Sequence, residues 1–149
     1  MISNKVFDFN LFYNDFYSSL NNVKIIEKNI PNQPNEIEEG NREYKKSLNF
    51  EFSKLGKLEN ILDKKATQML FRLNEGRGKA LYILGIEDNG ECKGITFLEL
   101  IKSIYFFNKI IGRVNGKCKS IRIYNGINGF LATIRIYKPF IDLHLLLEI

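Results

Sequence analysis

The run Lys79-Ala80-Leu81-Tyr82-Ile83-Leu84-Gly85-Ile86-Glu87, followed by Asp88-Asn89-Gly90, decides the fold class of this 149-residue chain. An apolar run this continuous predicts a central strand, because such a strand is covered on both faces. Asn-Gly tolerates positive φ at both turn positions, so the sequence predicts a hairpin with a short return strand over Glu91 to Ile95. We therefore expect a sheet with residues 79–87 near its middle.

Two amphipathic helices are expected, one on each side of this hairpin in the sequence. Apolar residues recur at helical spacing from about Lys57 to Asn74, and Gly76 is expected to end that helix as its left-handed residue. Thr96 and Glu99 form a capping box, which predicts a second helix that runs to about Val114. Both helices have one apolar face, so we expect them to pack on the sheet.

Alternating apolar residues predict the remaining strands. They cover Tyr44 to Phe52, Ser120 to Tyr124, Phe130 to Lys138 and, as a last short strand, Leu143 to Ile149. The resulting order is β-α-β-β-α-β-β, and its first six elements match the split βαβ, ferredoxin-like pattern. We therefore expect an α+β binding domain over residues 41–149, with one antiparallel sheet and two helices on one face.

The first 40 residues have a different pattern. Phe9, Phe12 and Phe16 belong to an aromatic stripe at helical spacing, which predicts an amphipathic helix within residues 1–20. Residues 21–40 contain two prolines and no helical or strand periodicity of apolar residues, so they are expected to be an extended linker. The helix either packs on its own domain or acts as an arm that docks these three rings on a partner.

Charge is unevenly distributed along the chain. Residues 1–40 carry a net charge of −3 and residues 41–149 a net charge of +8. A basic body suggests a polyanionic partner, most simply nucleic acid. Alternatively, the Asn, Ile and Lys bias of an AT-rich genome supplies the excess lysine. No apolar stretch is long enough to span a membrane, no signal peptide is evident, and two scattered cysteines indicate a reducing compartment, the cytoplasm.

No constellation for catalysis is evident in the sequence. A P-loop is missing, and Gly76-Arg77-Gly78-Lys79 follows a helix instead of opening one. His144 is the only histidine and stands in an apolar run, where it is more often structural. Acidic residues cluster near the body's first strand as an expected solvated approach; they are Glu36, Glu38, Glu39 and Glu43. The alternative, a divalent-ion site, lacks the spacing of a calcium loop. We expect a binding protein that is not an enzyme and needs no metal or cofactor.

The candidate binding residues are basic and aromatic. Arg122, Tyr124, Arg135 and Tyr137 alternate with core-facing isoleucines, so they should interleave on one exposed sheet face. Arginine can contact phosphate and tyrosine can stack on a base, although plain cross-strand packing explains the same pattern. The other basic candidates for contact with RNA are Arg42, Lys45, Lys46, Arg77 and Lys79.

Three separated blocks resemble the N-terminal domain of the elongation-factor-like "GTP-binding protein" GTPases. They are Glu38 to Lys45, Thr67 to Gly78 and Ala80 to Gly90, and the resemblance covers roughly residues 36–149. In that family a segment like Phe140 to Leu147 leads into the P-loop, whereas this sequence stops at Ile149. The family's GTPase activity is therefore not expected here.

The resemblance implies a translation context. The chain is also similar to dormancy factors on idle microsporidian ribosomes. We expect a factor, monomeric when free, that occupies a tRNA or mRNA site on the ribosome. One alternative is an interaction module that acts in trans with a translational GTPase. Another alternative is a small-ligand regulatory domain, which is suggested only by analogy with other ferredoxin-like folds.

Overall fold

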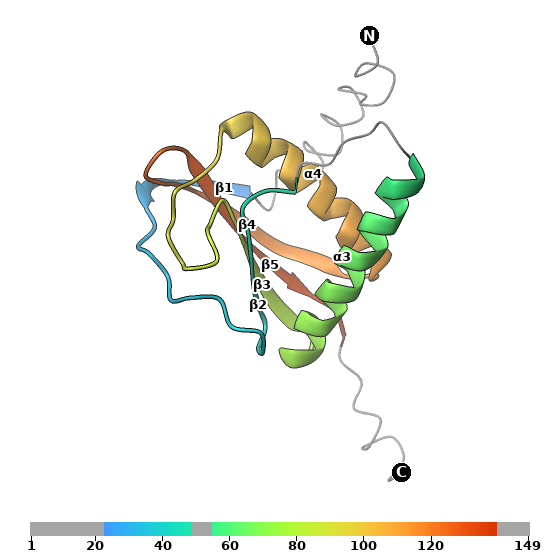
Figure 1. Ribbon diagram of the computed structural model, residues 1–149. Helices are drawn as coiled ribbons and strands as arrows, with labels where there is room; N and C mark the ends of the chain where they lie inside the picture. The colour runs from blue at the N-terminus through green and yellow to red at the C-terminus, as the bar shows by residue number, and fades with distance from the viewer. Residues whose placement is uncertain (1–22, 49–54, 140–149) are drawn as a thin grey trace, which may run out of the picture.

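A computed structural model describes residues 23–48 and 55–139 (Figure 1). Several expectations lie outside these residues. They are the helix within residues 1–20 with Phe9, Phe12 and Phe16, the strand positions Phe50 and Phe52, and the last strand from Leu143 to Ile149 with His144. The described residues form an α+β fold with one five-stranded sheet and two helices, as the sequence predicted at that level.

The sheet has the order β1-β4-β5-β3-β2. Its strands are β1 (Val23–Asn29), β2 (Arg42–Lys45), β3 (Lys79–Leu84), β4 (Lys117–Asn125) and β5 (Phe130–Tyr137). The prediction of an antiparallel sheet is wrong at both edges, because β1 is parallel to β4 and β2 is parallel to β3. A helix connects β2 to β3, and such a crossover makes the two strands parallel.

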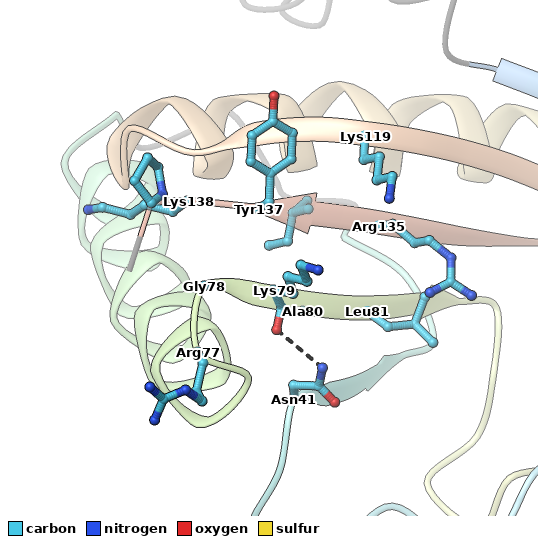
Figure 2. Close-up of a pocket in the computed structure, with 12 residues that line it drawn as sticks. Asn41, Arg77, Gly78, Lys79, Ala80, Leu81, Lys119, Arg135, Tyr137 and Lys138 are labelled. Atoms are coloured by element: carbon cyan, nitrogen blue, oxygen red, sulfur yellow. Dashed lines mark hydrogen bonds between the residues drawn. The ribbon is translucent and has the colours of Figure 1, made fainter. Parts of the chain in front are cut away.

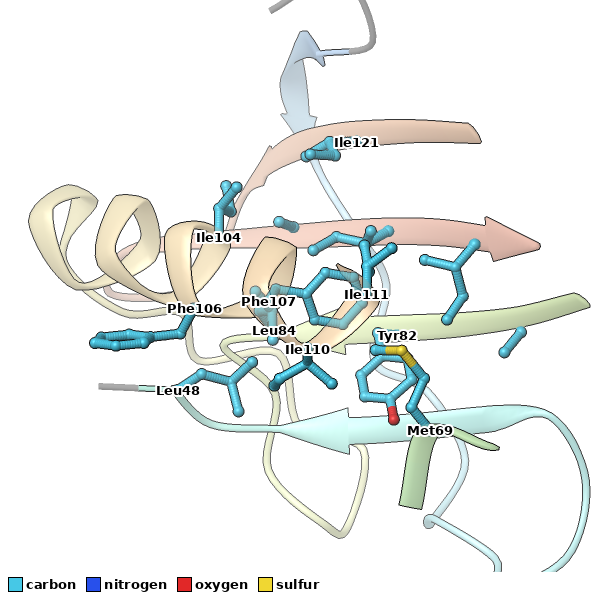
Figure 3. Packing of buried hydrophobic residues seen from close by; sticks show 14 of the residues in the cluster. Leu48, Met69, Tyr82, Leu84, Ile104, Phe106, Phe107, Ile110, Ile111 and Ile121 are labelled. Carbon is cyan, nitrogen blue, oxygen red and sulfur yellow. The ribbon is translucent and has the colours of Figure 1, made fainter. Parts of the chain in front are cut away.

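Two helices, α3 (Leu55–Glu75) and α4 (Phe97–Arg113), cover one face of the sheet, which confirms that part of the prediction (Figure 1). Thr96 caps α4 as expected, since its hydroxyl accepts a hydrogen bond from the Glu99 amide at 3.1 Å. The core lies between the helices and the sheet, where Tyr82 meets Phe107 edge to face at 4.9 Å between ring centroids (Figure 3). The opposite face of the sheet has no helix on it within the described residues.

The turn at Asp88-Asn89-Gly90 forms, but the predicted return strand does not. The Gly90 amide donates to the Glu87 carbonyl at 2.9 Å, yet Glu91 to Ile95 forms only an isolated bridge between Ile95 and Phe130. The backbone groups of this stretch are shared among several segments: Glu91 and Gly94 bond to residues 85–87, Cys92 and Lys93 accept from residues 127–128, and Asn32 Oδ1 accepts from the Cys92 amide at 3.0 Å. On the turn itself, the Gln33 amide donates to the Gly90 carbonyl at 2.8 Å. The ferredoxin-like arrangement needs the return strand in the sheet and is not confirmed.

The linker predicted over residues 21–40 is also wrong in part. Val23–Asn29 is the edge strand β1, and its pairing with β4 is a long-range contact that the local proline-rich pattern could not reveal. Residues 30–41, the crossing segment, then connect β1 at one edge of the sheet to β2 at the other. The segment is held on the turn at 88–90 by backbone hydrogen bonds, so it is part of the folded body.

Gly90 is a position at which a side chain should not be tolerated. Its φ is +89°, and a Cβ there would lie 1.8 Å from the Gln33 carbonyl oxygen. We expect Gly90→Ala to lower the free energy of unfolding by about 2–4 kcal/mol, because strain and overlap with backbone add. Urea unfolding followed by circular dichroism measures this.

Gly112 supplies the matched control for Gly90. It lies in the last turn of α4, where an added Cβ would meet no other atom within 4 Å. Gly112→Ala should stabilise the protein by about 0.5–1 kcal/mol, since alanine loses less backbone entropy in a helix. Equal effects of the two substitutions would show that the crossing segment does not seat on Gly90.

Candidate nucleic-acid interface

The face of the sheet opposite the helices, called here the open face, carries the predicted arginine and tyrosine pairs. Ile121, Ile123, Ile134 and Ile136 are buried under the helices, so the residues that alternate with them point the other way. Arg122, Tyr124, Arg135 and Tyr137 therefore share the open face, as predicted. The β4–β5 register shifts between Cys118 and Ser120, and this irregularity leaves Lys119 on the same face.

The crossing segment covers one end of the open face. Ile30 packs on a small apolar cluster that includes Ile83, Cys92 and Leu131, and the Tyr44 hydroxyl donates to the Pro34 carbonyl at 2.9 Å. Tyr124 is paired with Leu131 at this covered end and is half-buried. The accessible part of the open face is therefore its other half, where β3 begins and β5 ends.

A basic hollow of about 700 Å³ occupies this accessible half (Figure 2). Its cationic side chains come from the loop after α3, from three neighbouring strands and from the residue after β5; they are Arg77, Lys79, Lys119, Arg135 and Lys138. Tyr137 is 43% exposed and lies among them. Among residues 23–48 and 55–139, no carboxylate lines the hollow, so these residues give it a positive electrostatic potential suited to an anionic ligand.

The loop Gly76-Arg77-Gly78 brings Arg77 to the hollow through an unusual backbone conformation. Arg77 (φ +53°) and Gly78 (φ +96°) are the left-handed residues, so the prediction for Gly76 is wrong. The Gly78 amide donates to the Leu73 carbonyl at 2.8 Å, which ends α3 in a Schellman motif with Arg77 at C′. Gly76 is required for another reason, because a Cβ there would lie 1.8 Å from the Lys79 carbonyl oxygen.

Arg77 thus occupies a position that favours glycine. We expect Arg77→Gly to raise the free energy of unfolding by up to about 1 kcal/mol, because it relieves the left-handed strain of a residue with a Cβ. Arg77→Ala keeps the strain and should not stabilise the fold. Both variants should weaken binding of a polyanion equally, as measured by heparin-column elution. A stabilised Arg77→Ala, or unchanged elution of both, would contradict this account.

The structure does not bring all predicted residues together. Lys45 is paired with Leu84 on the helix-covered face and forms an ion pair with Glu43 at 3.5 Å, so the structure does not bring it to the open face with the other predicted contacts. Lys46 is exposed and pairs with Glu87 at 3.7 Å, away from the hollow. Arg42 lies beside Leu81 on the open face, and Arg122 lies farther along the same face beside Thr133.

Sequence reasoning missed the most constrained ionic group of the described residues. Arg72 of α3 is buried, and its Nε donates to Glu43 Oε1 at 2.9 Å. Its two terminal nitrogens also donate to the backbone carbonyls of Ile37, Glu38, Glu39 and Gly40 at 2.9–3.2 Å. The acidic approach is therefore not simply solvated, because Glu43 lies inside this cluster. A charged residue in the apolar stripe of α3, between Met69 and Leu73, was the available signal.

Neither cysteine is activated. Burial raises the pKa of the Cys92 thiol, and it raises the pKa of Cys118 to about 11. Both thiols are therefore protonated at neutral pH, and a thiol is a weak nucleophile in that form.

The raised pKa of Cys118 predicts a loss of stability at alkaline pH. The unfolded thiol ionises near pH 8.5, whereas the folded thiol ionises near pH 11, so the stabilisation is complete below about pH 8.5 and is lost as the pH rises towards 11. Urea unfolding at pH 8 and pH 10 should show a larger decrease for the wild type than for Cys118→Val, which cannot ionise. Equal decreases would contradict the assignment.

Comparison with known proteins yields one match in two species. The chain is 35% identical over 98 residues to GTP-binding protein 2 of Mus musculus and of Homo sapiens. The alignment covers 63% of this chain and 15% of each relative, so the chain spans a small part of the length of the curated proteins it matches. This similarity agrees with the predicted resemblance to the GTP-binding proteins.

Other comparisons found nothing. No family model and no solved structure matches the chain. Across residues 23–48 and 55–139, no helix has the length and apolar character needed to cross a membrane. The same residues contain no group of three or more His, Cys, Asp or Glu side chains placed to hold a metal ion.

Proposed function

We propose that this protein is a ribosome-binding factor that attaches to ribosomal RNA through its open face. It would occupy a tRNA or mRNA site on idle ribosomes and keep them dormant, without catalysing a reaction and in the cytoplasm. The basic hollow is the observation that supports this proposal most directly, because five cationic residues line it and no carboxylate of the described residues does. RNA carries a high density of phosphates, and these are the anions that a basic surface of this kind would bind.

The electrostatic character of the hollow fits a binding role better than a structural one. In the described part of the chain, Lys79, Lys119 and Arg135 form no ion pair, although Lys45, Arg72 and Arg113 do. Like charges on one face repel one another and lower the stability of the free protein. Such a cost is expected at a functional site, where a polyanionic partner compensates it on binding.

The N-terminal arm, residues 1–20, would provide a second contact with the ribosome. Phe9, Phe12 and Phe16 lie outside the described residues, and we propose that they dock on a ribosomal protein or an RNA groove. The first described residue, Val23, begins β1 at the edge of the sheet next to β4. An arm attached there could occupy a second site near the open face and increase the affinity through effective concentration.

Sedimentation of ribosomes through sucrose gradients tests this function. The full chain should migrate with ribosomes at 50 mM salt and dissociate steeply as the salt concentration rises to 300 mM, because phosphate contacts release counterions. The Arg135→Glu variant should dissociate at lower salt than the wild type. If the wild-type protein stays at the top of the gradient at 50 mM salt, the proposed function is wrong.

A second candidate function is supported by the similarity to a part of GTP-binding protein 2. In this alternative the chain is an interaction module that acts in trans with a translational GTPase. Affinity purification from RNase-treated lysate separates the two candidates. A GTPase retained in the absence of RNA would favour the alternative, whereas ribosomal components lost on RNase treatment would favour RNA binding.

A further inference from the structure

The cations of the open face extend across the sheet and are not confined to the basic hollow. The strand registers place Arg42 beside Leu81, Leu81 beside Arg135, and Arg135 beside Ser120. One row farther along, Thr133 is beside Arg122, and Arg122 is beside Lys24 of β1. These residues therefore form a path from one sheet edge to the other, about 19 Å wide at roughly 4.8 Å per strand.

An aromatic ring lies beside this path, one row nearer the end of β5. Tyr137 is paired with Lys79 on one side and with Lys117 on the other, so a 43% exposed ring lies between two exposed lysines. Figure 2 shows Tyr137, Lys79, Lys119 and Arg135 on neighbouring strands around the same hollow. A base can stack on such a ring while its flanking phosphates meet the cations on both sides.

The ring distinguishes a single strand from a duplex. In a duplex the bases are stacked on each other and unavailable to a tyrosine, so double-stranded RNA would engage only the cations. An unpaired strand uses both the ring and the cations. The crossing segment also covers the face at the Leu131 end, so a strand laid across β3, β5 and β4 would lie at the other end, beside Tyr137.

We propose that the open face binds single-stranded RNA that runs across the strands, with one base stacked on Tyr137 and phosphates on Lys79, Arg135 and Arg122. This inference rests on the proposed function and adds the kind of RNA that is bound. Four to five phosphate contacts are expected from the cations along the path. The logarithm of the binding constant should then fall with the logarithm of the salt concentration with a slope of about −3 to −3.5.

Fluorescence anisotropy with the full chain tests this inference. The probes are a labelled 12-nucleotide RNA without self-complementarity and the same RNA annealed to its complement. We expect at least about tenfold tighter binding of the single strand, a gain available only through stacking. Tyr137→Leu should weaken single-strand binding about 5- to 150-fold, whereas Tyr137→Phe keeps the ring and should bind as the wild type does. Thermal melts of both variants control for folding.

Three results would overturn the inference: equal or tighter binding of the duplex, equal binding by Tyr137→Leu and Tyr137→Phe, or equal binding of polyglutamate of the same charge. These outcomes are separable from the proposed function. A protein that migrates with ribosomes but shows no single-strand preference retains the function and loses this inference. A protein that prefers single strands but stays at the top of the gradient retains this inference and loses the function.

Discussion

Replacing Arg72 with methionine is expected to lower the free energy of unfolding by about 3–5 kcal/mol, because the buried Glu43 carboxylate then keeps only its 3.5 Å ion pair with Lys45. Four backbone carbonyls of residues 37–40 lose their hydrogen-bond donor in the same variant. Urea unfolding at pH 7 measures the loss. A decrease below about 1 kcal/mol would show that the Arg72 cluster does not hold the crossing segment in place.

A double variant separates the buried charge from the lost hydrogen bonds. Arg72→Met combined with Glu43→Leu removes both charges, so it should recover part of the loss. The carbonyls of residues 37–40 remain without a donor, so the recovery should be incomplete. The Arg72 cluster also has a consequence for the hollow, since Asn41 follows these carbonyls and its side chain donates to the Lys79 carbonyl at 3.2 Å.

Reversing two charges of the hollow is expected to reduce ribosome affinity about 100-fold. Lys79→Glu combined with Arg135→Glu removes two phosphate contacts and introduces repulsion, and loss of an interfacial charge pair costs about 2 kcal/mol or more. The double variant should be at least as stable as the wild type, because it relieves repulsion on the open face. Binding to purified ribosomes at 100 mM salt, together with urea unfolding, measures both effects.

The matched control changes the same number of charges on the helix layer. Lys64 of α3 and Lys109 of α4 are both exposed and lie away from the hollow. Lys64→Glu combined with Lys109→Glu should leave ribosome affinity within about threefold of the wild type. Salt screens charges that lie far from the bound RNA, so only a small change in affinity is expected from them. If both double variants lose affinity equally, net charge and not the open face determines binding.

The features that sequence analysis predicted correctly depend on local signals. The capping box at Thr96 and Glu99 fixed the start of α4, because both partners lie within one turn. The alternation of isoleucine with arginine and tyrosine in β4 and β5 identified the open face, because side-chain direction in a strand has a period of two. Four of the nine predicted RNA contacts meet in the hollow: Arg135 and Tyr137 by this alternation, Lys79 from the start of β3 and Arg77 from the loop after α3.

The features that sequence analysis missed depend on contacts between distant segments. β1 is stabilised by β4, about 100 residues away in the chain, and the proline-rich pattern beside it pointed to a linker. Residues after Gly90 divide their hydrogen bonds among residues 85–87, residues 127–130 and the crossing segment and form no return strand, so the turn signal alone was insufficient. Lys45 was expected on the exposed side of its strand, but β2 is only four residues long and has little alternation of its own. Glu43 points towards α3 to pair with Arg72, so Lys45, two residues later, lies on the same helix-covered side.

Lysine acetylation, compared between the free and the ribosome-bound protein, tests most directly whether the open face is the binding surface. Acetylation at each lysine can be quantified by mass spectrometry without altering the chain. We expect Lys79, Lys119 and Lys138 to be protected on the ribosome, while Lys64 and Lys109 on the helix layer stay reactive. Protection of the helix lysines with an unprotected open face would contradict the account.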